Sequence, residues 1–268
     1  MSSIYLFPVS GVITAVCAYF VWETVWRTPR VSAKTVAIIL TVSMALTLYA
    51  LLRLEPVTEW GIDFKLPAAV AISVLIVQYI YALGLMHHGI QGLGLFLLPA
   101  TAIPLLVVPL MPQTPYVWVH TTTFLETSHL LISLLAYAIL TLAALHALMH
   151  LLLDHALKRK QIGRITQSLP SLIEIETHMY AQIRSATWLL ALGIISGLTW
   201  QWEGMGHFAL VSHKVILALF SWFVLLALLV MRKRAGWQGR RASIMVLTAY
   251  VLLLLAYFGV RLIESWLS

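Results

Sequence analysis

Charged residues are scarce in this 268-residue sequence, since Asp, Glu, Lys and Arg together make up only 10% of it. Soluble globular domains carry about 25% charged residues and are about half apolar. Here 61% of the residues are hydrophobic, and the mean hydropathy is +0.92. The composition excludes a sizeable soluble domain and indicates a protein surrounded by membrane lipid. Basic cytoplasmic loops then explain the net charge of +7, and no nucleic-acid partner is expected.

Cysteine is nearly absent as well, because Cys17 stands alone. A single cysteine excludes an intrachain disulfide, a Cys-x-x-Cys dithiol relay and the Cys-x-x-Cys-His haem-attachment motif of c-type cytochromes. The sequence also lacks a phosphate-binding loop, a Gly-x-Ser-x-Gly elbow and a His-Glu-x-x-His motif. No complete catalytic signature is present, and the chain is not expected to act as an enzyme on its own.

Apolar stretches long enough to cross a bilayer, which takes about 20 residues each, recur along the chain. Short charged or Pro/Gly-rich segments separate them. We predict an all-α fold, a polytopic membrane bundle of about eight transmembrane helices, in a single domain over residues 1–268. The predicted spans are about 4–25, 35–53, 66–86, 93–111, 129–153, 185–201, 210–231 and 243–266.

Basic residues are distributed unevenly between the predicted loops. Three loops on one side hold 13 of the 17 Lys and Arg residues, within 27–34, 158–184 and 232–241. Because Lys and Arg accumulate on the cytoplasmic side of membrane proteins, this asymmetry predicts that both termini lie outside. No basic segment precedes the first span and no small-residue cleavage site follows it, so we expect a retained span rather than a signal peptide.

Two segments are expected to differ from plain spans. Pro99, Pro104 and Pro109 predict a kinked fourth span. Residues 169–183 carry a capping-box pattern from Ser171 to Glu174, followed by apolar residues at helical spacing. This pattern predicts a short amphipathic helix on the cytoplasmic face of the membrane, before the span at 185–201.

Ten histidines in so apolar a chain need an explanation, because ionisable residues at membrane depth are costly. His129 and His213 each begin an odd-numbered predicted span, which places them at the outer ends of their helices. Two histidines at one depth and facing each other could hold a haem iron through both axial positions. Lys214 and Arg261 are placed where either could pair with the haem propionates.

Aromatic residues near this end could supply a flat apolar surface for a porphyrin; they are Trp200, Trp202 and Trp222. The alternative interpretation is that the histidines are interfacial polar residues and the tryptophans form an aromatic belt. His146 and His150 lie four residues apart on the fifth predicted span. That spacing suits a metal such as zinc, or hydrogen bonds across the bundle.

Several motifs follow one another in a characteristic order. The first motif is Ser128-His129 at the start of a predicted helix that contains Tyr137-Ala138. Two motifs follow it: Leu169-Pro-Ser-Leu-Ile-Glu174 and Leu192-Gly-Ile-Ile-Ser-Gly197. The tail holds Gly236-Trp-Gln-Gly-Arg-Arg241 and then Tyr257-Phe-Gly259. This order resembles the cytochrome c assembly family, the CcsA, ResC, CcmC and HemX group, and the tail resembles its small YpjD/HemX-like branch. The resemblance covers roughly residues 125–265.

The resemblance implies a haem-handling protein of the bacterial inner membrane with a part in cytochrome c biogenesis. It implies non-covalent, b-type haem as the cofactor, held or presented at the outer face by His129 and His213. The loop that runs from Trp200 through Trp202 to His207 corresponds to the family's tryptophan-rich, haem-presenting loop.

The sequence also departs from the family pattern. The Trp-Gly-x-x-Trp-x-Trp-Asp signature is reduced to Trp200, Trp202 and Glu203, and Arg261 follows Tyr257-Phe-Gly259 where the full-length synthases carry a histidine nearby. Two other functions therefore stay open. One is an accessory subunit or modulator of a transporter or another membrane partner, and the other is a scaffold whose basic loops dock a cytoplasmic haem-biosynthesis enzyme.

Overall fold

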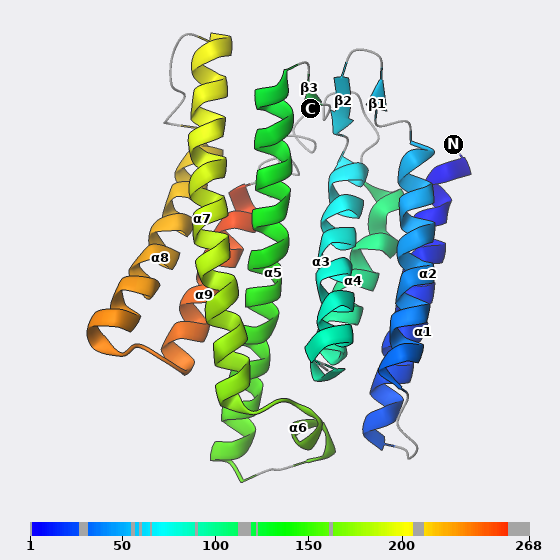
Figure 1. Ribbon diagram of the computed structural model, residues 1–268, viewed down its shortest axis with the longest axis vertical. Coiled ribbons are helices and arrows are strands. Elements are labelled where there is room, and N and C mark those ends of the chain that lie inside the picture. Colours follow the sequence, from blue (N-terminus) through cyan, green and yellow to red (C-terminus); the bar gives the residue numbers. More distant parts are fainter. Residues whose placement is uncertain are drawn as a thin grey trace. The chain divides into compact units, whose positions relative to one another are not determined.

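The computed structural model describes residues 2–26, 32–54, 57–58, 61–64, 66–88, 91–111, 119–121, 123–160, 163–205 and 212–256. These residues are almost entirely helical, which confirms the predicted all-α membrane fold (Figure 1). The helices are α1 (Leu6–Trp26), α2 (Ala33–Leu52), α3 (Leu66–His88), α4 (Gly94–Val107), α5 (Phe124–Lys158), α6 (Arg164–Ser168), α7 (Leu172–Met205), α8 (His213–Ala235) and α9 (Arg240–Leu254). Short 3₁₀ turns occupy Ser2–Tyr5, Gln91–Leu93 and Val108–Leu110.

Three short strands accompany the helices: β1 (Val57–Thr58), β2 (Gly61–Phe64) and β3 (Val119–Thr121). They form a sheet in the order β1-β2-β3, in which β1 and β2 are antiparallel with Val57 opposite Ile62. The sequence analysis missed this small sheet because strands of two to four residues are too short to show an alternating pattern.

Six of the described helices are long and apolar enough to cross a membrane: α1, α2, α3, α5, α7 and α8. Large apolar side chains face outward from the helices, among them Ile38, Val42, Ile103, Trp188, Ile195, Phe220 and Phe223. Such surfaces are unfavourable in water and are expected against lipid. The protein is therefore a multi-pass membrane protein.

The predicted fourth and eighth spans coincide with shorter helices. The fourth is α4 and the 3₁₀ turn after it, which together run over Gly94–Leu110 and contain Pro99, Pro104 and Pro109. The eighth corresponds to α9, beyond which the described part of the chain ends at 256. A total of eight spans and the outside location of both termini stay predictions.

The chain divides into two compact units, and each is described by itself. The first covers Met1–His120 and His155–Ser171, with α1 to α4 and α6. Its interior contains hydroxyl groups: Ser10 Oγ lies 2.9 Å from Ser43 Oγ, and Thr14 Oγ1 lies 2.6 Å from Ser43 Oγ. Gln78 of α3 donates to Thr14 Oγ1 at 3.3 Å. In a lipid-surrounded bundle such hydrogen bonds hold neighbouring helices together.

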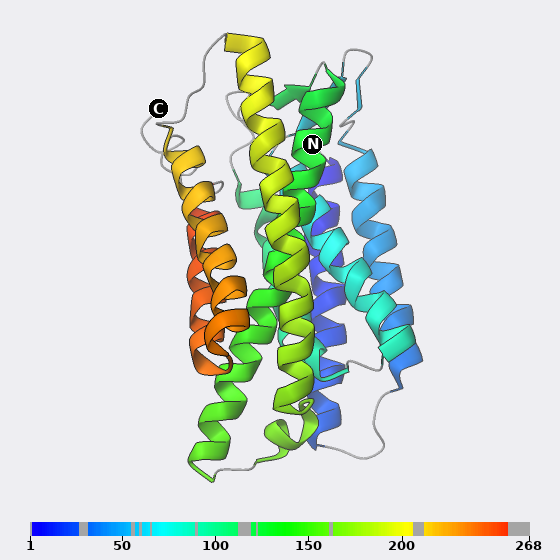
Figure 2. The same ribbon diagram turned by 60° about the vertical axis from the view of Figure 1, so that its left-hand side comes forward.

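The second unit covers Thr121–Asp154 and Leu172–Ser268, with α5, α7, α8 and α9 (Figure 2). Small side chains of α5, namely Ala136, Ala143 and Ala147, are buried in its core and allow the helices to approach closely. The other buried core residues are Leu140 of α5, Met179, Tyr180, Ile183, Ala186 and Leu190 of α7, Leu225 and Leu228 of α8, and Ala242, Val246, Ala249 and Leu253 of α9.

α5 begins at Phe124, earlier than the predicted span at 129–153, because a capping box precedes it. The Thr123 N–H donates to Glu126 Oε2 at 3.1 Å, and the Glu126 N–H donates to Thr123 Oγ1 at 3.3 Å. The helix then has 35 residues and is about 52 Å long, against a hydrocarbon thickness of about 30 Å. It therefore extends well beyond the predicted span.

α7 joins the predicted surface helix at 169–183 and the predicted span at 185–201 into one helix of 34 residues. It begins at Leu172, directly after Ser171, where the capping pattern predicts a helix start. No Pro or Gly occurs between Leu172 and Leu192 to break it. The apolar stripe of Ile175, Met179 and Ile183 is buried in the protein, in contact with the core of the second unit.

Candidate functional site

His129 lies in the second turn of α5 with its half-buried imidazole against α7. Its Nδ1 lies 2.9 Å from the carbonyl oxygen of Gly193 and 3.1 Å from Ser196 Oγ. A Cβ atom on Gly197 would lie 2.7 Å from His129 Cε1, a distance that side chains do not tolerate. Gly197 thus leaves a slot on α7 that the ring fills, and the carbonyl of Gly193, four residues earlier, accepts the hydrogen bond of the ring.

The hydrogen bond to Gly193 determines the tautomer of His129. A carbonyl oxygen can only accept, so Nδ1 carries the proton and Nε2 keeps its lone pair. Metal-ligating histidines commonly donate their other ring N–H to a backbone carbonyl in this way, which orients the ring and increases its basicity. In this tautomer Nε2 is the ring nitrogen that could accept a metal ion.

Trp200 lies beside His129 and is held in place from α5. The two rings are stacked, with centroids 6.2 Å apart and an interplanar angle of 29°. The indole Nε1 donates to Glu126 Oε1 at 2.7 Å, while Oε2 of the same carboxylate caps α5. Glu126 therefore fixes both the start of α5 and the position of Trp200, so the histidine, the indole and the carboxylate form one cluster.

The sequence analysis missed the roles of Glu126, Gly193 and Gly197 in this cluster. The signals are present: Thr123-Phe-Leu-Glu126 is a capping box, and Gly193-Ile-Ile-Ser-Gly197 is a Gly-x-x-x-Gly motif, which lets membrane helices approach closely. A motif in the sequence does not show which residue of another helix it will contact. In the structure Gly197 faces His129, and Glu126 accepts from Trp200.

The other predicted site residues are placed differently. His213 is the first residue of α8, after its N-cap Ser212, and the side chains of both His213 and Lys214 are exposed. Trp202, near the end of α7, is 54% exposed. His207 and Arg261 lie outside the described residues. The facing pair of His129 and His213 and the two propionate contacts stay predictions.

Trp222 was a further candidate for the porphyrin surface. Its indole Nε1 donates to the carbonyl oxygen of Thr187 at 3.2 Å, and its ring packs edge-on against Phe223 with centroids 5.1 Å apart. The side chain is half-buried against the core of the second unit. In this arrangement it connects α8 to α7.

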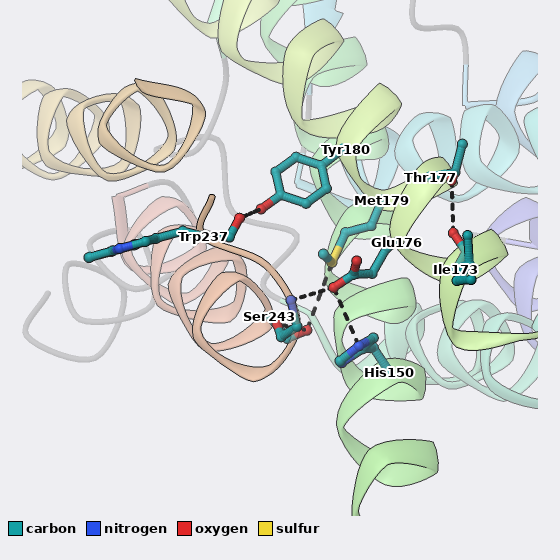
Figure 3. Close-up of polar contacts among 9 residues, drawn as sticks. His150, Ile173, Glu176, Thr177, Met179, Tyr180, Trp237 and Ser243 are labelled. Atoms are coloured by element: carbon teal, nitrogen blue, oxygen red, sulfur yellow. Dashed lines mark hydrogen bonds and ion pairs between the residues drawn. The ribbon is translucent and has the colours of Figure 1, made fainter. Parts of the chain in front are cut away.

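A second polar cluster surrounds His150, which is only 4% exposed (Figure 3). His150 Nε2 lies 3.6 Å from Glu176 Oε1 on α7, and the two side chains point toward each other. The same carboxylate oxygen accepts from the Gly239 N–H at the start of α9. Gly239 has φ +65° and ψ −135°, a conformation that is essentially restricted to glycine. Glu176 thus connects α5, α7 and α9.

Tyr180, one helical turn along α7, holds the loop between α8 and α9. Its Oη donates to the carbonyl oxygen of Trp237 at 2.6 Å (Figure 3), and the Arg232 guanidinium lies 3.4 Å from the centre of its ring. Gly236, with φ +63°, ends α8 in the left-handed conformation. The Gly-Trp-Gln-Gly segment therefore makes a defined turn against α7.

His146 has partners of its own, although it shares a helix face with His150. Its Nδ1 lies 2.9 Å from the Leu142 carbonyl oxygen, and its ring centroid lies 5.9 Å from that of His178 on α7. His146 and His150 are thus directed to different groups. Over the residues that the structure describes, no group of three or more His, Cys, Asp or Glu side chains is arranged to hold a metal ion.

The fold and the site define a class: a polytopic helical membrane protein with an oriented histidine and a stacked tryptophan near the end of two long helices. The family model described as "Cytochrome C assembly protein" matches residues 31–268, so the chain belongs to that family, and the predicted resemblance is confirmed.

The chain is also similar to proteins of several bacteria. The chain is 34% identical over 141 residues to "Inner membrane protein YpjD" of Escherichia coli K12, which is 52% of each chain. It is 34% identical over 137 residues to an uncharacterised 28.8 kDa protein of Azospirillum brasilense, 51% of each chain. It is 38% identical over 88 residues to "Cytochrome c biogenesis protein CcsA" of Prochlorococcus marinus, which is 33% of this chain and 28% of the relative. The chain spans about half the length of the first two relatives.

Proposed function

We propose that this protein binds haem non-covalently at the outer face of the bacterial inner membrane and presents it during cytochrome c biogenesis. The observation that carries the proposal is the His129 imidazole, whose Nδ1–H bond to Gly193 leaves the Nε2 lone pair available for iron. Stacked against it, Trp200 offers an aromatic face to a porphyrin edge. Two relatives support the pathway and the location, since one is named a cytochrome c biogenesis protein and the other an inner membrane protein.

In this proposal His213 supplies the second axial nitrogen. It begins α8, and its exposed side chain is free to reorient when a ligand enters. Lys214 and Arg261 pair with the propionates, and the loop from Trp200 through Trp202 to His207 covers the porphyrin. Haem itself supplies the iron chemistry, while the chain binds and orients it.

A haem titration of the purified protein in detergent tests the proposal. Wild type is expected to give the Soret and α bands of low-spin, bis-histidine haem. His129→Ala and His213→Ala should each weaken haem affinity at least tenfold and change the spectrum, whereas His155→Ala, an exposed histidine at the far end of α5, should leave both unchanged. Identical spectra and affinities in all four proteins would refute the axial assignment.

Docking of a cytoplasmic protein is a second candidate function, favoured by the exposed basic residues Lys158, Arg159 and Lys160. Co-purification of cytoplasmic partners should then be lost when these three residues are changed to Glu, while haem binding is retained. Retained co-purification in the charge-reversed variant would count against docking at this loop.

A further inference from the structure

The seam between α5 and α7 contains two imidazoles that face each other away from the proposed haem site. His146 of α5 is 1% exposed, and the side chain of His178 on α7 is half-buried. Their ring centroids lie 5.9 Å apart, with an interplanar angle of 34°. Gln182, one turn beyond His178, lies beside the His146 ring. Three polar side chains from two helices thus meet within a mostly apolar core.

The hydrogen bonding of His146 leaves its inner nitrogen as an acceptor. Nδ1 lies 2.9 Å from the Leu142 carbonyl oxygen, so Nδ1 carries the proton and Nε2 has the lone pair. Nε2 is buried and has no hydrogen-bond partner among the described residues, and the same is true of Gln182 Oε1. A buried acceptor without a donor is costly, and a cation bound to His146 Nε2 removes that cost.

The ring spacing fits a shared metal ion. A zinc–imidazole bond of about 2.0–2.1 Å places each ring centroid about 3.2 Å from the metal. Two rings that bind the same ion at an N–metal–N angle of about 109–180° therefore have centroids about 5.2–6.4 Å apart. The observed 5.9 Å falls within this interval. The Nδ1–H bond of His146 to Leu142 is also the outer contact expected of a ligating histidine.

We propose that His146 Nε2 and the His178 imidazole, with Gln182 Oε1 as a further oxygen donor, bind a transition-metal ion of the zinc and copper class. Imidazole ligands suit these metals. Negative charge is available one turn along the seam, where Glu176 lies beside His150. The bound ion links α5 to α7 at a place distinct from His129, and it does not depend on the proposed haem function.

Metal binding to the haem-free, chelator-treated protein in detergent tests this proposal. Equilibrium dialysis with Zn²⁺ and, under reducing conditions, Cu⁺ should give one tightly bound ion per chain, and Co²⁺ should give d–d absorption bands. His146→Gln and His178→Gln should each lower the affinity at least tenfold, and Gln182→Leu should lower it less. His155→Gln removes an exposed histidine from the same helix and should change nothing.

Two comparisons keep the outcome decisive. His178 is half-buried, so His178→Gln tests the site even if His146→Gln fails to fold. His129→Ala should retain full zinc or copper binding while it loses haem, which separates this site from the proposed haem site. The proposal is overturned if wild type binds none of the three ions, or if His155→Gln lowers affinity as much as His146→Gln does.

Discussion

Gly197→Ala is the sharpest test of the His129 slot, because Gly193→Ala is a matched control on the same helix. A Cβ on Gly197 would lie 2.7 Å from Cε1, 3.1 Å from Nδ1 and 3.3 Å from Nε2 of His129. A Cβ on Gly193 would lie 3.4 Å from Ser133 Oγ and 3.9 Å from Ile132, which is ordinary contact. The two substitutions are chemically identical and differ only in what the new methyl group meets.

The expected difference in the free energy of unfolding follows from these distances. Replacing Gly by Ala inside a helix favours the helix by roughly 0.5–1 kcal/mol, and this gain is common to both variants. At Gly197 the methyl group displaces the imidazole and breaks its bond to Gly193, for an overpacking cost of about 1–3 kcal/mol. Gly197→Ala should therefore be less stable than Gly193→Ala by about 1–3 kcal/mol.

Thermal or steric-trap unfolding in detergent measures the stability difference, and haem titration measures its consequence at the ligand. Gly197→Ala should weaken haem binding about tenfold, since a loss of about 1.4 kcal/mol in ligand orientation corresponds to that factor. Gly193→Ala should bind haem like wild type. If both variants unfold at the same temperature, the slot does not hold His129 as described.

Substitutions at three further positions test other contacts. Glu126→Ala removes the carboxylate half of the α5 capping box and the acceptor of Trp200. It should cost about 1–3 kcal/mol with a red shift in tryptophan fluorescence, whereas Glu126→Gln keeps an acceptor and should cost less. Tyr137→Phe removes the bond of Oη to the Leu253 carbonyl oxygen at 2.8 Å and should lower thermal stability by about 0.5–1.5 kcal/mol. Gly239→Ala forces alanine into φ +65° and ψ −135° and should lower the free energy of unfolding by about 1–3 kcal/mol. The variant should be cleaved faster by protease between α8 and α9, and a cleavage rate equal to that of wild type would contradict this.

The helices were predictable because hydropathy and length determine where a chain crosses lipid. The start of α5 was placed too late, at 129, because the apolar run begins there while the helix begins at its cap, Thr123. α7 was divided because its first half is amphipathic and its second half apolar, a change of composition that does not interrupt a helix. Composition locates a membrane segment, whereas caps and breakers determine the ends of the helix.

The site was predictable in part. The sequence analysis places His129 and Trp200 at the same end of their helices, and their rings are stacked in the structure. The outer location of that end stays a prediction. The sequence could not show that Gly197 leaves room for the His129 ring or that Gly193 accepts its hydrogen bond. Nor could it show that His146 faces His178 and shares no ligand with His150. Those contacts depend on the register and rotation of two helices, which a single sequence does not specify.

That register connects the two proposed sites. Glu126 contacts Trp200, His129 contacts Gly193 and Gly197, and His150 contacts Glu176, so α5 and α7 run antiparallel in one continuous register. His129 and His146 lie 17 residues apart, about 26 Å along α5, and the hydrocarbon core is about 30 Å thick. Along α5 the two imidazoles are therefore separated by a distance close to the thickness of the hydrocarbon core. A slip of α5 by one turn would separate both from their partners, so an ion that binds His146 and His178 should also stabilise the slot that orients His129.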